Sequence, residues 1–383
     1  MPPITPAIVC LGYNRPASLG RLLHSLTMAS YPDTDIPLVI SLDHSDDAEC
    51  LRLAERFEWS HGPKRVLTRP VRAGLRRHVL ECGDLSEEYG AIVMLEDDIA
   101  VAPGFHRYAT AALRFYEHAD DVAGVSLYSH RLSFASNLPF MPLPTEYDAF
   151  FLQFPASWGQ AWTASQWRGF RRWLADAGDT RIHPDLPEQV RLWPESSWVK
   201  LFASYCRYEG KTWAYPYDSY TTNFADAGFH VREGSSVYQV PLTLECGGEP
   251  RFPRPLATPA DYDPYFENRS VFVAEAVGIA PADFECDLYG VKPLGPARKG
   301  YLATTRPCRS SILSTQMIYK PLELNLLYRP EGGDIRVAET AAVHGTAAPV
   351  DWRRFVYFSP NRTSVKRFAQ IAGERLVRRI FTR

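Results

Sequence analysis

The sequence predicts an α/β protein with a mostly parallel, twisted sheet and helices on both of its faces. Short apolar runs with the length of buried strands alternate with segments in which apolar residues recur every three or four positions, as in helices. Acidic, basic and glycine residues come directly after several of these runs, where a parallel sheet opens its ligand crevice. The chain has 383 residues, 45% of them hydrophobic, which is enough for one large domain with an extension.

The first strand is predicted at residues 7–11, and the first helix begins with Pro16 in its first turn. Proline fits this place because its missing N–H group would have no partner there. The apolar residues that follow are spaced i, i+3, i+4 and i+7, which gives the helix one buried face. They are Leu19, Leu22, Leu23 and Leu26.

The second strand is predicted at residues 37–42 and ends in Asp43. Ser45 is expected to cap the helix that follows. The buried face of this helix consists of Cys50, Leu53, Ala54 and Phe57. A third strand at 65–68 leads through Gly74 into a helix whose inward residues are Leu75, Val79 and Cys82. This alternation of strands and helices favours a parallel sheet.

The fourth predicted strand, residues 91–95, runs directly into three carboxylates, Glu96, Asp97 and Asp98. Side chains alternate along a strand, so Glu96 and Asp98 are expected to point one way and Asp97 the other. Because adjacent anions repel one another, a hard divalent cation with oxygen ligands is predicted to keep them ionised. A solvated acidic turn is the alternative.

The residues that follow the predicted strands suit a nucleotide. Asp43 can accept a hydrogen bond from a base N–H group, and Arg15 and Arg76 can approach the base or the phosphates. A cation on Asp98 can bridge a diphosphate. For each arginine, a surface salt bridge is the alternative. No Gly-x-Gly-x-x-Gly follows the first strand and no Gly-x-x-x-x-Gly-Lys-Ser/Thr occurs, which argues against dinucleotide and P-loop sites.

Together, these motifs resemble those of the GT-A glycosyltransferases. They are Gly12-Tyr13-Asn14-Arg15-Pro16, Asp43, Gly74-Leu75-Arg76, Leu95-Glu96-Asp97-Asp98 and Ala102-Pro103-Gly104-Phe105. Over residues 7–245 the chain is most similar to the N-acetylglucosaminyltransferase I-like group and its bacterial polysaccharide-assembly relatives. The resemblance implies a Rossmann-like GT-A fold, Mn²⁺ or Mg²⁺ on Asp98 and uracil against Asp43. The other residues expected at the donor site are Gly12, Arg15, Gly74, Arg76, Glu96 and Asp97.

An aromatic-rich segment follows at residues 154–162. Flat aromatic faces suit the C–H faces of sugar rings, and Gly159 allows a close approach of the backbone. The segment also resembles the acceptor side of the bacterial relatives, and we expect Trp158, Gly159 and Trp198 to contact the acceptor. Trp162 and Trp167 are expected in the core.

An inverting transfer needs a carboxylate that takes the proton of the acceptor hydroxyl. The relatives place an aspartate beside the tryptophan that corresponds to Trp198, whereas this chain has serine before it and valine after it. The nearest carboxylate is Glu195, which is expected to be the base, with Asp218 and Asp226 as further candidates. A first-turn glutamate stabilised by the helix dipole is the alternative.

His230 lies in a segment that resembles the loop closing over the donor in these relatives. The resemblance implies that His230 completes the metal shell or reaches the diphosphate. A hydrogen-bonded structural histidine is the alternative.

Charge is distributed unevenly along the chain. Residues 361–383 carry +6 and the remainder −8, and the composition gives no indication of nucleic-acid binding. The C-terminal segment has the pattern of a basic amphipathic helix on an anionic membrane surface. Docking on its own domain, or on a second copy in a homo-oligomer, is the alternative. The seven scattered cysteines, with no signal peptide and no membrane-spanning run, indicate a cytoplasmic protein, peripheral on the inner face of the cell membrane.

Three regions are predicted: a glycosyltransferase domain at 1–249, an extension of unknown role at 250–360, and the tail helix at 361–383. The predicted activity is metal-dependent, inverting transfer of a sugar from a nucleotide-sugar, UDP-linked by preference, to a glycan or lipid-linked glycan in bacterial surface polysaccharide assembly. The alternatives are a catalytically degenerate glycan-binding or scaffold protein on the same fold, and a sugar-1-phosphate nucleotidyltransferase. The sugar, the linkage and the acceptor stay open.

Overall fold

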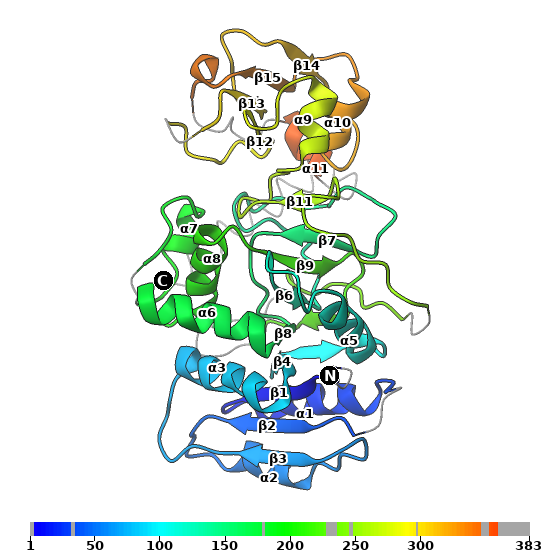
Figure 1. The fold of residues 1–383 in the computed structure, drawn as a ribbon, viewed down its shortest axis with the longest axis vertical. Helices are drawn as coiled ribbons and strands as arrows, with labels where there is room; N and C mark the ends of the chain where they lie inside the picture. Colours follow the sequence, from blue (N-terminus) through cyan, green and yellow to red (C-terminus); the bar gives the residue numbers. More distant parts are fainter. Residues whose placement is uncertain are drawn as a thin grey trace, which may run out of the picture.

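The structure is a computed structural model, and it describes residues 4–31, 35–177, 181–226, 236–244, 248–295, 298–345 and 352–358. Its parts are stacked along one long axis (Figure 1). The first strands and helices lie at one end, the C-terminal extension lies at the other, and a single large sheet joins the first end to the middle.

Nine strands form this large sheet. They are β1 (Ala7–Gly12), β2 (Leu38–Leu42), β3 (Lys64–Leu67), β4 (Ala91–Glu96), β6 (Val122–Ser126), β7 (Ala149–Leu152), β8 (Gln160–Thr163), β9 (Thr212–Pro216) and β11 (Asp261–Tyr262). Their order is β3-β2-β1-β4-β8-β6-β9-β7-β11. In this order, the neighbours β3, β2, β1 and β4 are parallel. The strand β8 is antiparallel to both β4 and β6, and β7 is antiparallel to β9. The pairs β6–β9 and β7–β11 are parallel. The predicted α/β fold with a mostly parallel sheet is confirmed.

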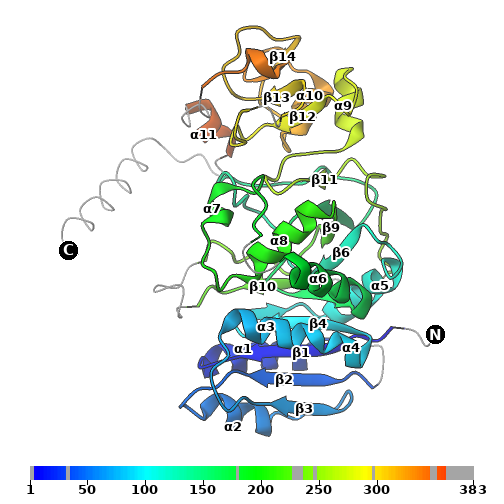
Figure 2. The same ribbon diagram turned by 60° about the vertical axis from the view of Figure 1, so that its left-hand side comes forward.

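Helices cover both faces of the sheet (Figure 2). They are α1 (Pro16–Thr27), α2 (Glu49–Arg56), α3 (Leu75–Asp84), α4 (Ser86–Tyr89), α5 (Phe105–Phe115), α6 (Ala164–Ala177), α7 (Glu188–Arg191) and α8 (Trp198–Tyr208). Alternate residues of β4 serve the two faces, as the pleat of a strand requires. Ile92 and Met94 join the core cluster that contains α3, α6 and α8, whereas Val93 and Leu95 join the one that contains α1, α2 and α5.

The second helix begins later than predicted. It starts at Glu49, so Ser45 does not cap it and that prediction is wrong. The polar side chains of this loop instead accept hydrogen bonds from nearby backbone N–H groups. Ser45 Oγ accepts from the N–H of Asp47 at 3.2 Å, and Asp47 Oδ1 accepts from the N–H of Glu49 at 2.9 Å. Leu75, predicted to point inward, is 38% exposed because it is the first residue of α3.

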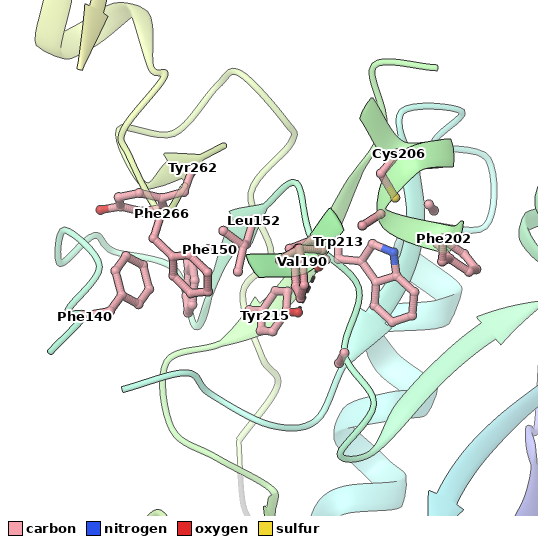
Figure 3. Packing of buried hydrophobic residues seen from close by; sticks show 14 of the residues in the cluster. Phe140, Phe150, Leu152, Val190, Phe202, Cys206, Trp213, Tyr215, Tyr262 and Phe266 are labelled. Carbon is pink, nitrogen blue, oxygen red and sulfur yellow. Dashed lines mark hydrogen bonds between the residues drawn. The ribbon is translucent and has the colours of Figure 1, made fainter. Parts of the chain in front are cut away.

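Aromatic side chains fill the core between the sheet and the helices beyond it. Trp162 and Trp167 stack with their ring centroids 4.6 Å apart, and both are at most 1% exposed, so their predicted place in the core is confirmed. Figure 3 shows the same cluster continuing from Phe202 past Trp213 to Phe266, which follows β11. One core therefore extends from the sheet toward the extension.

The extension has a sheet of its own. Its strands, in the order β12-β13-β15-β14, are β12 (Phe284–Asp287), β13 (Tyr301–Thr304), β15 (Ile335–Glu339) and β14 (Leu313–Thr315). The helices around it are α9 (Val271–Val277), α10 (Glu323–Tyr328), the 3₁₀ turn η1 (Thr340–Ala342) and α11 (Trp352–Phe358). Since β11 also comes from the predicted extension, that region contributes one strand to the large sheet.

The cysteines that the structure describes are all free, and all but Cys308 are buried. Cys246 and the predicted tail helix at 361–383 lie outside the described residues. Among the helices that are described, none is both long and apolar enough to cross a bilayer.

Candidate active site

The acidic cluster, defined as Glu96, Asp97 and Asp98, lies where β4 ends. Glu96 is the last residue of the strand, and the two aspartates form a turn into β5 (Ile99–Val101), which pairs with β10 (Thr221–Asn223). The strict alternation predicted for the cluster is wrong because the strand ends at Glu96. Both aspartates instead contact the same cation, Arg15.

Arg15 reaches the acidic cluster from the loop between β1 and α1. It makes an ion pair through Nη2 with Asp97 Oδ1, while Nε donates to Asp97 Oδ2 at 3.3 Å and Nη1 donates to Asp98 Oδ2 at 3.3 Å. Burial disfavours the charged form of Arg15, but the carboxylates outweigh this effect and raise its pKa. Burial raises the pKa of Asp97 to about 6, even though Arg15 opposes this shift.

Glu96 ends the strand β4 and is half-buried. Burial, together with the charges of Asp98 and Asp97, raises its pKa well above the ordinary value, and a hydrogen bond from Trp198 opposes the rise. Its Oε1 is buried without a hydrogen-bond partner among the described residues. The cluster therefore combines one carboxyl group that favours the protonated form with two carboxylates held by a guanidinium.

A crevice of about 390 Å³ opens over the acidic cluster at the carboxyl ends of β1, β2 and β4. This volume is within the range of small-molecule sites. Its lining residues are Leu11, Gly12, Tyr13, Asn14, Arg15, Asp43, Arg72, Gly74, Leu75, His78, Glu96, Asp97, Asp98, Trp158, Ser196, Asn223, Ala225, Asp226 and Tyr238. The structure thus brings together most of the donor-site residues that were expected from the sequence.

Asp43 holds the loop that borders this crevice. Its Oδ1 accepts from the N–H groups of His44 at 2.9 Å and Ala73 at 2.8 Å, and its Oδ2 accepts from that of Gly74 at 2.9 Å. Burial alone would raise the pKa of Asp43, but these three bonds lower it. A carboxylate has about four acceptor positions, so one remains for a ligand N–H group.

The arginine that lines the crevice beside Gly74 is Arg72, not Arg76. The helix α3 begins at Leu75 and carries Arg76 in its first turn, outside the crevice lining, so a role of Arg76 at the donor stays a prediction. Arg72 lies in the loop that Asp43 holds, with its guanidinium carbon 4.7 Å from the centroid of the Tyr13 ring. Both arginines are close to Gly74 in the sequence, and only the start of the helix distinguishes them.

Trp158 lines the crevice, and its neighbour Gly159 is buried beside it. Trp158 is half-buried and packs against Tyr238 and Tyr128, at ring centroid distances of 4.7 and 4.8 Å. Its carbonyl accepts a hydrogen bond of 2.5 Å from Thr221 Oγ1. Gly159 has φ of +96°, and a Cβ placed on it would lie 2.6 Å from Thr221 Cγ2.

Gly159→Ala is therefore expected to lower the free energy of unfolding by 2 kcal/mol or more, about 1 kcal/mol from the positive φ and the rest from displacing Thr221. Urea unfolding measures this loss. Gly90→Ala is the matched control, because Gly90 has φ of +76° but nothing within 4 Å of an added Cβ. Equal losses in the two variants would show that the contact between Gly159 and Thr221 is unimportant.

Residues that were expected at the acceptor or as the base but do not line the crevice are Gly159, Trp198 and Glu195. Trp198 is only 1% exposed and packs in the core, so it offers no face to an acceptor; its contact with Glu96 supports the acidic cluster instead. Glu195 is exposed and precedes the helix, because Ser197 caps α8 by accepting from the N–H of Lys200 at 3.3 Å. The neighbour of Glu195 that does line the crevice is Ser196. These positions correct the expected roles of Trp198 and Glu195.

Of the remaining carboxylates expected as a base, Asp226 lines the crevice, whereas Asp218 lies in a separate hollow. Asp226 accepts from Ser18 Oγ at 2.7 Å and makes an ion pair with Arg21. Burial opposes the charged form, but these partners lower the pKa of Asp226, so it is ionised at neutral pH. His230 lies outside the described residues.

The acidic cluster fits a hard divalent cation. Asp98 Oδ1 and Glu96 Oε1 are buried and have no hydrogen-bond partner within the described chain. No set of three or more His, Cys, Asp or Glu side chains is arranged as a complete metal site in the described ranges. This arrangement is compatible with Mg²⁺ or Mn²⁺, because such ions often take one or two carboxylates and complete their shell with water and substrate phosphates.

Two buried histidines near the crevice make the fold sensitive to acid. Burial, aided by Arg69, lowers the pKa of His78 to about 4, and burial lowers that of His130 to about 3. Since unfolded histidine titrates near pH 6.5, these two side chains bind more protons in the unfolded chain below that pH, and their contribution to stability falls as the pH drops toward 4. The slope is about 1.4 kcal/mol per pH unit for each histidine.

These two histidines are therefore expected to lower the free energy of unfolding between pH 6.5 and 4.5, whereas Asp97, whose pKa burial raises to about 6, acts in the opposite direction. His130→Phe should lessen the decrease, because His130 is enclosed by aromatic rings and its Nε2 is buried without a partner in the described structure. Urea unfolding at several pH values measures both slopes. Identical slopes for the variant and the parent protein would rule out this role of His130.

No known family description matches the sequence, and no curated protein matches it. Among solved structures, the chain is similar to S. aureus TarS 1–349 in complex with UDP-GlcNAc, with a TM-score of 0.40 and 15% identity over 59% of this chain and 60% of that one. It is also similar to GalNAc-T7 with UDP, GalNAc and Mn²⁺, with a TM-score of 0.37 and 13% identity over 56% of this chain and 43% of that one.

Both neighbours are GT-A glycosyltransferases. The chain spans only 60% of the length of the TarS fragment, and scores at this level carry no argument about function. They also do not assign the chain to the N-acetylglucosaminyltransferase I-like group. What the fold and the site define is an α/β protein with a nucleotide-sized crevice over an acidic strand end.

Proposed function

We propose that this protein is a GT-A glycosyltransferase that moves a sugar from a nucleotide-sugar, UDP-linked by preference, to a hydroxyl group of a glycan. The observation that carries the proposal is the crevice itself: the acidic cluster, the loop held by Asp43 and the ring of Trp158 meet in it. These residues come from segments far apart in the sequence, and the motif resemblance had named each of them for this function.

The donor occupies the crevice with its base toward Asp43 and its diphosphate toward Asp98. The remaining acceptor position of Asp43 suits the N–H group of uracil, and Arg72 on Tyr13 borders the same end. A Mn²⁺ or Mg²⁺ ion held by Asp98 would neutralise the charge that develops on the leaving diphosphate. Arg15 supplies a second positive charge within reach of the phosphates.

The acceptor sugar stacks on Trp158, and Asp226 takes the proton of the attacking hydroxyl group. Among the described carboxylates proposed as a base, Asp226 is the one that lines the crevice without belonging to the acidic cluster. Ser18 and Arg21 fix its orientation. Attack with a single base on the face opposite the leaving group inverts the anomeric carbon.

A lipid-linked glycan in bacterial surface polysaccharide assembly is the proposed acceptor class. The support is the basic amphipathic pattern of residues 361–383, which suits an anionic membrane surface. In this proposal the tail holds the enzyme on the inner face of the cell membrane, where such acceptors are exposed.

Thermal unfolding with UDP-, GDP-, dTDP- and CMP-sugars, each with Mn²⁺ or with EDTA, tests the proposal together with an assay of donor hydrolysis. A ligand at a hundred times its Kd adds about 2.7 kcal/mol of stability, so binding raises the Tm. We expect the rise with a UDP-sugar and Mn²⁺, accompanied by slow release of UDP. No rise with any donor contradicts the proposal. Binding in EDTA without turnover indicates the scaffold alternative, and pyrophosphate release from UTP and a sugar 1-phosphate indicates the nucleotidyltransferase.

A further inference from the structure

Arg15 occupies the position in the acidic cluster where a positive charge is needed. Its guanidinium bridges Asp97 and Asp98, and the side chains of these aspartates are only 6% and 16% exposed. A planar guanidinium has several N–H donors, so the guanidinium of Arg15 can bind both carboxylates at once. The cluster therefore carries its own counter-ion in the absence of any ligand.

We infer that Arg15 is a built-in counter-ion that keeps free metal ions off the acidic cluster and is transferred to the donor diphosphate when the nucleotide-sugar binds with its metal. The inference rests on the proposed function and adds the order in which the charges are exchanged. It concerns what Arg15 does before catalysis.

The two carboxylate oxygens of Asp98 have different surroundings. Oδ2 accepts from Arg15, whereas Oδ1 is buried and has no partner in the described part of the chain. A divalent cation on Oδ1 would lie within a few ångströms of the guanidinium, and like charges so close in a partly buried site repel strongly. Metal binding without nucleotide is therefore weak while Arg15 stays in place.

A diphosphate changes this balance because it brings negative charge to the same place. Arg15 can then leave Asp97 and Asp98 for phosphate oxygens, to which guanidinium groups bind in the same bidentate way. The freed carboxylates accept the metal. Nucleotide and metal thus strengthen each other's binding, and by linkage the two effects are equal in size.

Arg21, which pairs with a residue that lines the crevice, makes no ion pair with the acidic cluster in the described structure. Arg21 is paired with Asp226, and Arg72 lies over the ring of Tyr13. Arg21 is therefore a matched control: Arg21→Gln removes the same charge from beside Asp226, which lines the crevice, but frees no carboxylate of the acidic cluster.

The experiment measures the Kd of Mn²⁺ by electron paramagnetic resonance, with and without saturating UDP, for the full-length protein and its variants. Without UDP, Arg15→Gln should bind Mn²⁺ about tenfold or more tightly than the parent protein, and the gain in Mn²⁺ affinity on adding UDP should shrink. Arg15→Lys keeps the charge but cannot bridge two carboxylates, so its affinity for Mn²⁺ should lie between those of the parent protein and Arg15→Gln. Arg21→Gln should change the Mn²⁺ affinity far less than Arg15→Gln does.

An unchanged Mn²⁺ affinity of both Arg15 variants without UDP overturns the inference, as does an increase of the same size in Arg21→Gln. Circular dichroism and the Tm of each variant confirm that it is folded. Failure of the proposed function looks different: neither the parent protein nor any variant then binds UDP, with or without Mn²⁺.

Discussion

Replacing Asp98 with asparagine is expected to lower kcat/KM for sugar transfer by at least about a hundredfold. Asparagine keeps the shape of the side chain but removes its negative charge. In the structure, Asp98 Oδ1 is buried without a partner among the described residues, so it is the oxygen best placed to hold a cation against a leaving diphosphate. Losing that charge weakens stabilisation of the transition state more than it weakens the fold.

The measurement is the rate of donor hydrolysis or transfer over a range of Mn²⁺ concentrations. Asp98→Asn should remain folded, and excess Mn²⁺ should restore little of the rate. Asp46→Asn is the control, since Asp46 follows β2 on the same side of the sheet but its side chain is fully exposed. It should leave the rate unchanged. Full activity of Asp98→Asn would contradict both metal binding by Asp98 and the proposed mechanism.

The parallel part of the sheet and its crevice could be predicted because their signals are local. Residues 91–95 form an unbroken apolar run and are all 0% exposed in the structure. Asp43 and the acidic cluster follow such runs directly. Because parallel strands end at the same edge, residues that follow them meet there however the rest of the chain folds.

Contacts between distant segments could not be predicted in this way. Arg15 and Asp97 are 82 residues apart, and Ser18 and Asp226 are 208 apart, so no periodicity relates the partners. The sequence indicated a missing positive charge beside the acidic cluster and a divalent cation as its simplest source, whereas the structure places a guanidinium there. The adjacent carboxylates do have a counter-charge, and the chain itself supplies it through Arg15.

The sequence also does not reveal which of the two tryptophans expected at the acceptor side faces the crevice. Trp158 and Trp198 both stand beside small or polar residues, which gave no reason to separate them. The cap at Ser197 makes Trp198 the first residue of α8, where it is buried in the core, whereas Trp158 lines the crevice. The start of one helix, uncertain from sequence by a few residues, decides which ring meets solvent.

Replacing Lys292 with methionine is expected to lower the free energy of unfolding by about 3–5 kcal/mol. Lys292 is 1% exposed, and its Nζ lies 2.5 Å from Asp263 Oδ2 and 2.7 Å from Glu285 Oε1. Burial disfavours its charge, yet these carboxylates raise the pKa of Lys292. Methionine fills a similar volume but leaves two partly buried carboxylates without this cation.

Lys292 lies where the extension meets the large sheet, so its replacement should weaken the junction between these two parts. Asp263 directly follows β11 of the large sheet, whereas Glu285 belongs to β12 of the extension, so one ammonium group joins the two parts. Arg298 reinforces the junction by pairing with Glu285 and with Asp185. We therefore expect the extension to become more sensitive to protease in the variant, while the first strands are less affected.

Urea unfolding followed by circular dichroism, together with limited proteolysis, measures the effect. Lys299→Met is the matched control: Lys299 is exposed and donates to the carbonyl of Pro281, and its replacement should change stability by no more than about 0.5 kcal/mol. Adding Asp263→Asn to Lys292→Met should recover part of the loss, because this carboxylate no longer requires a cation, while Glu285 keeps its pair with Arg298. If Lys292→Met and Lys299→Met unfold at the same urea concentration, the buried ion pairs do not hold the extension to the large sheet.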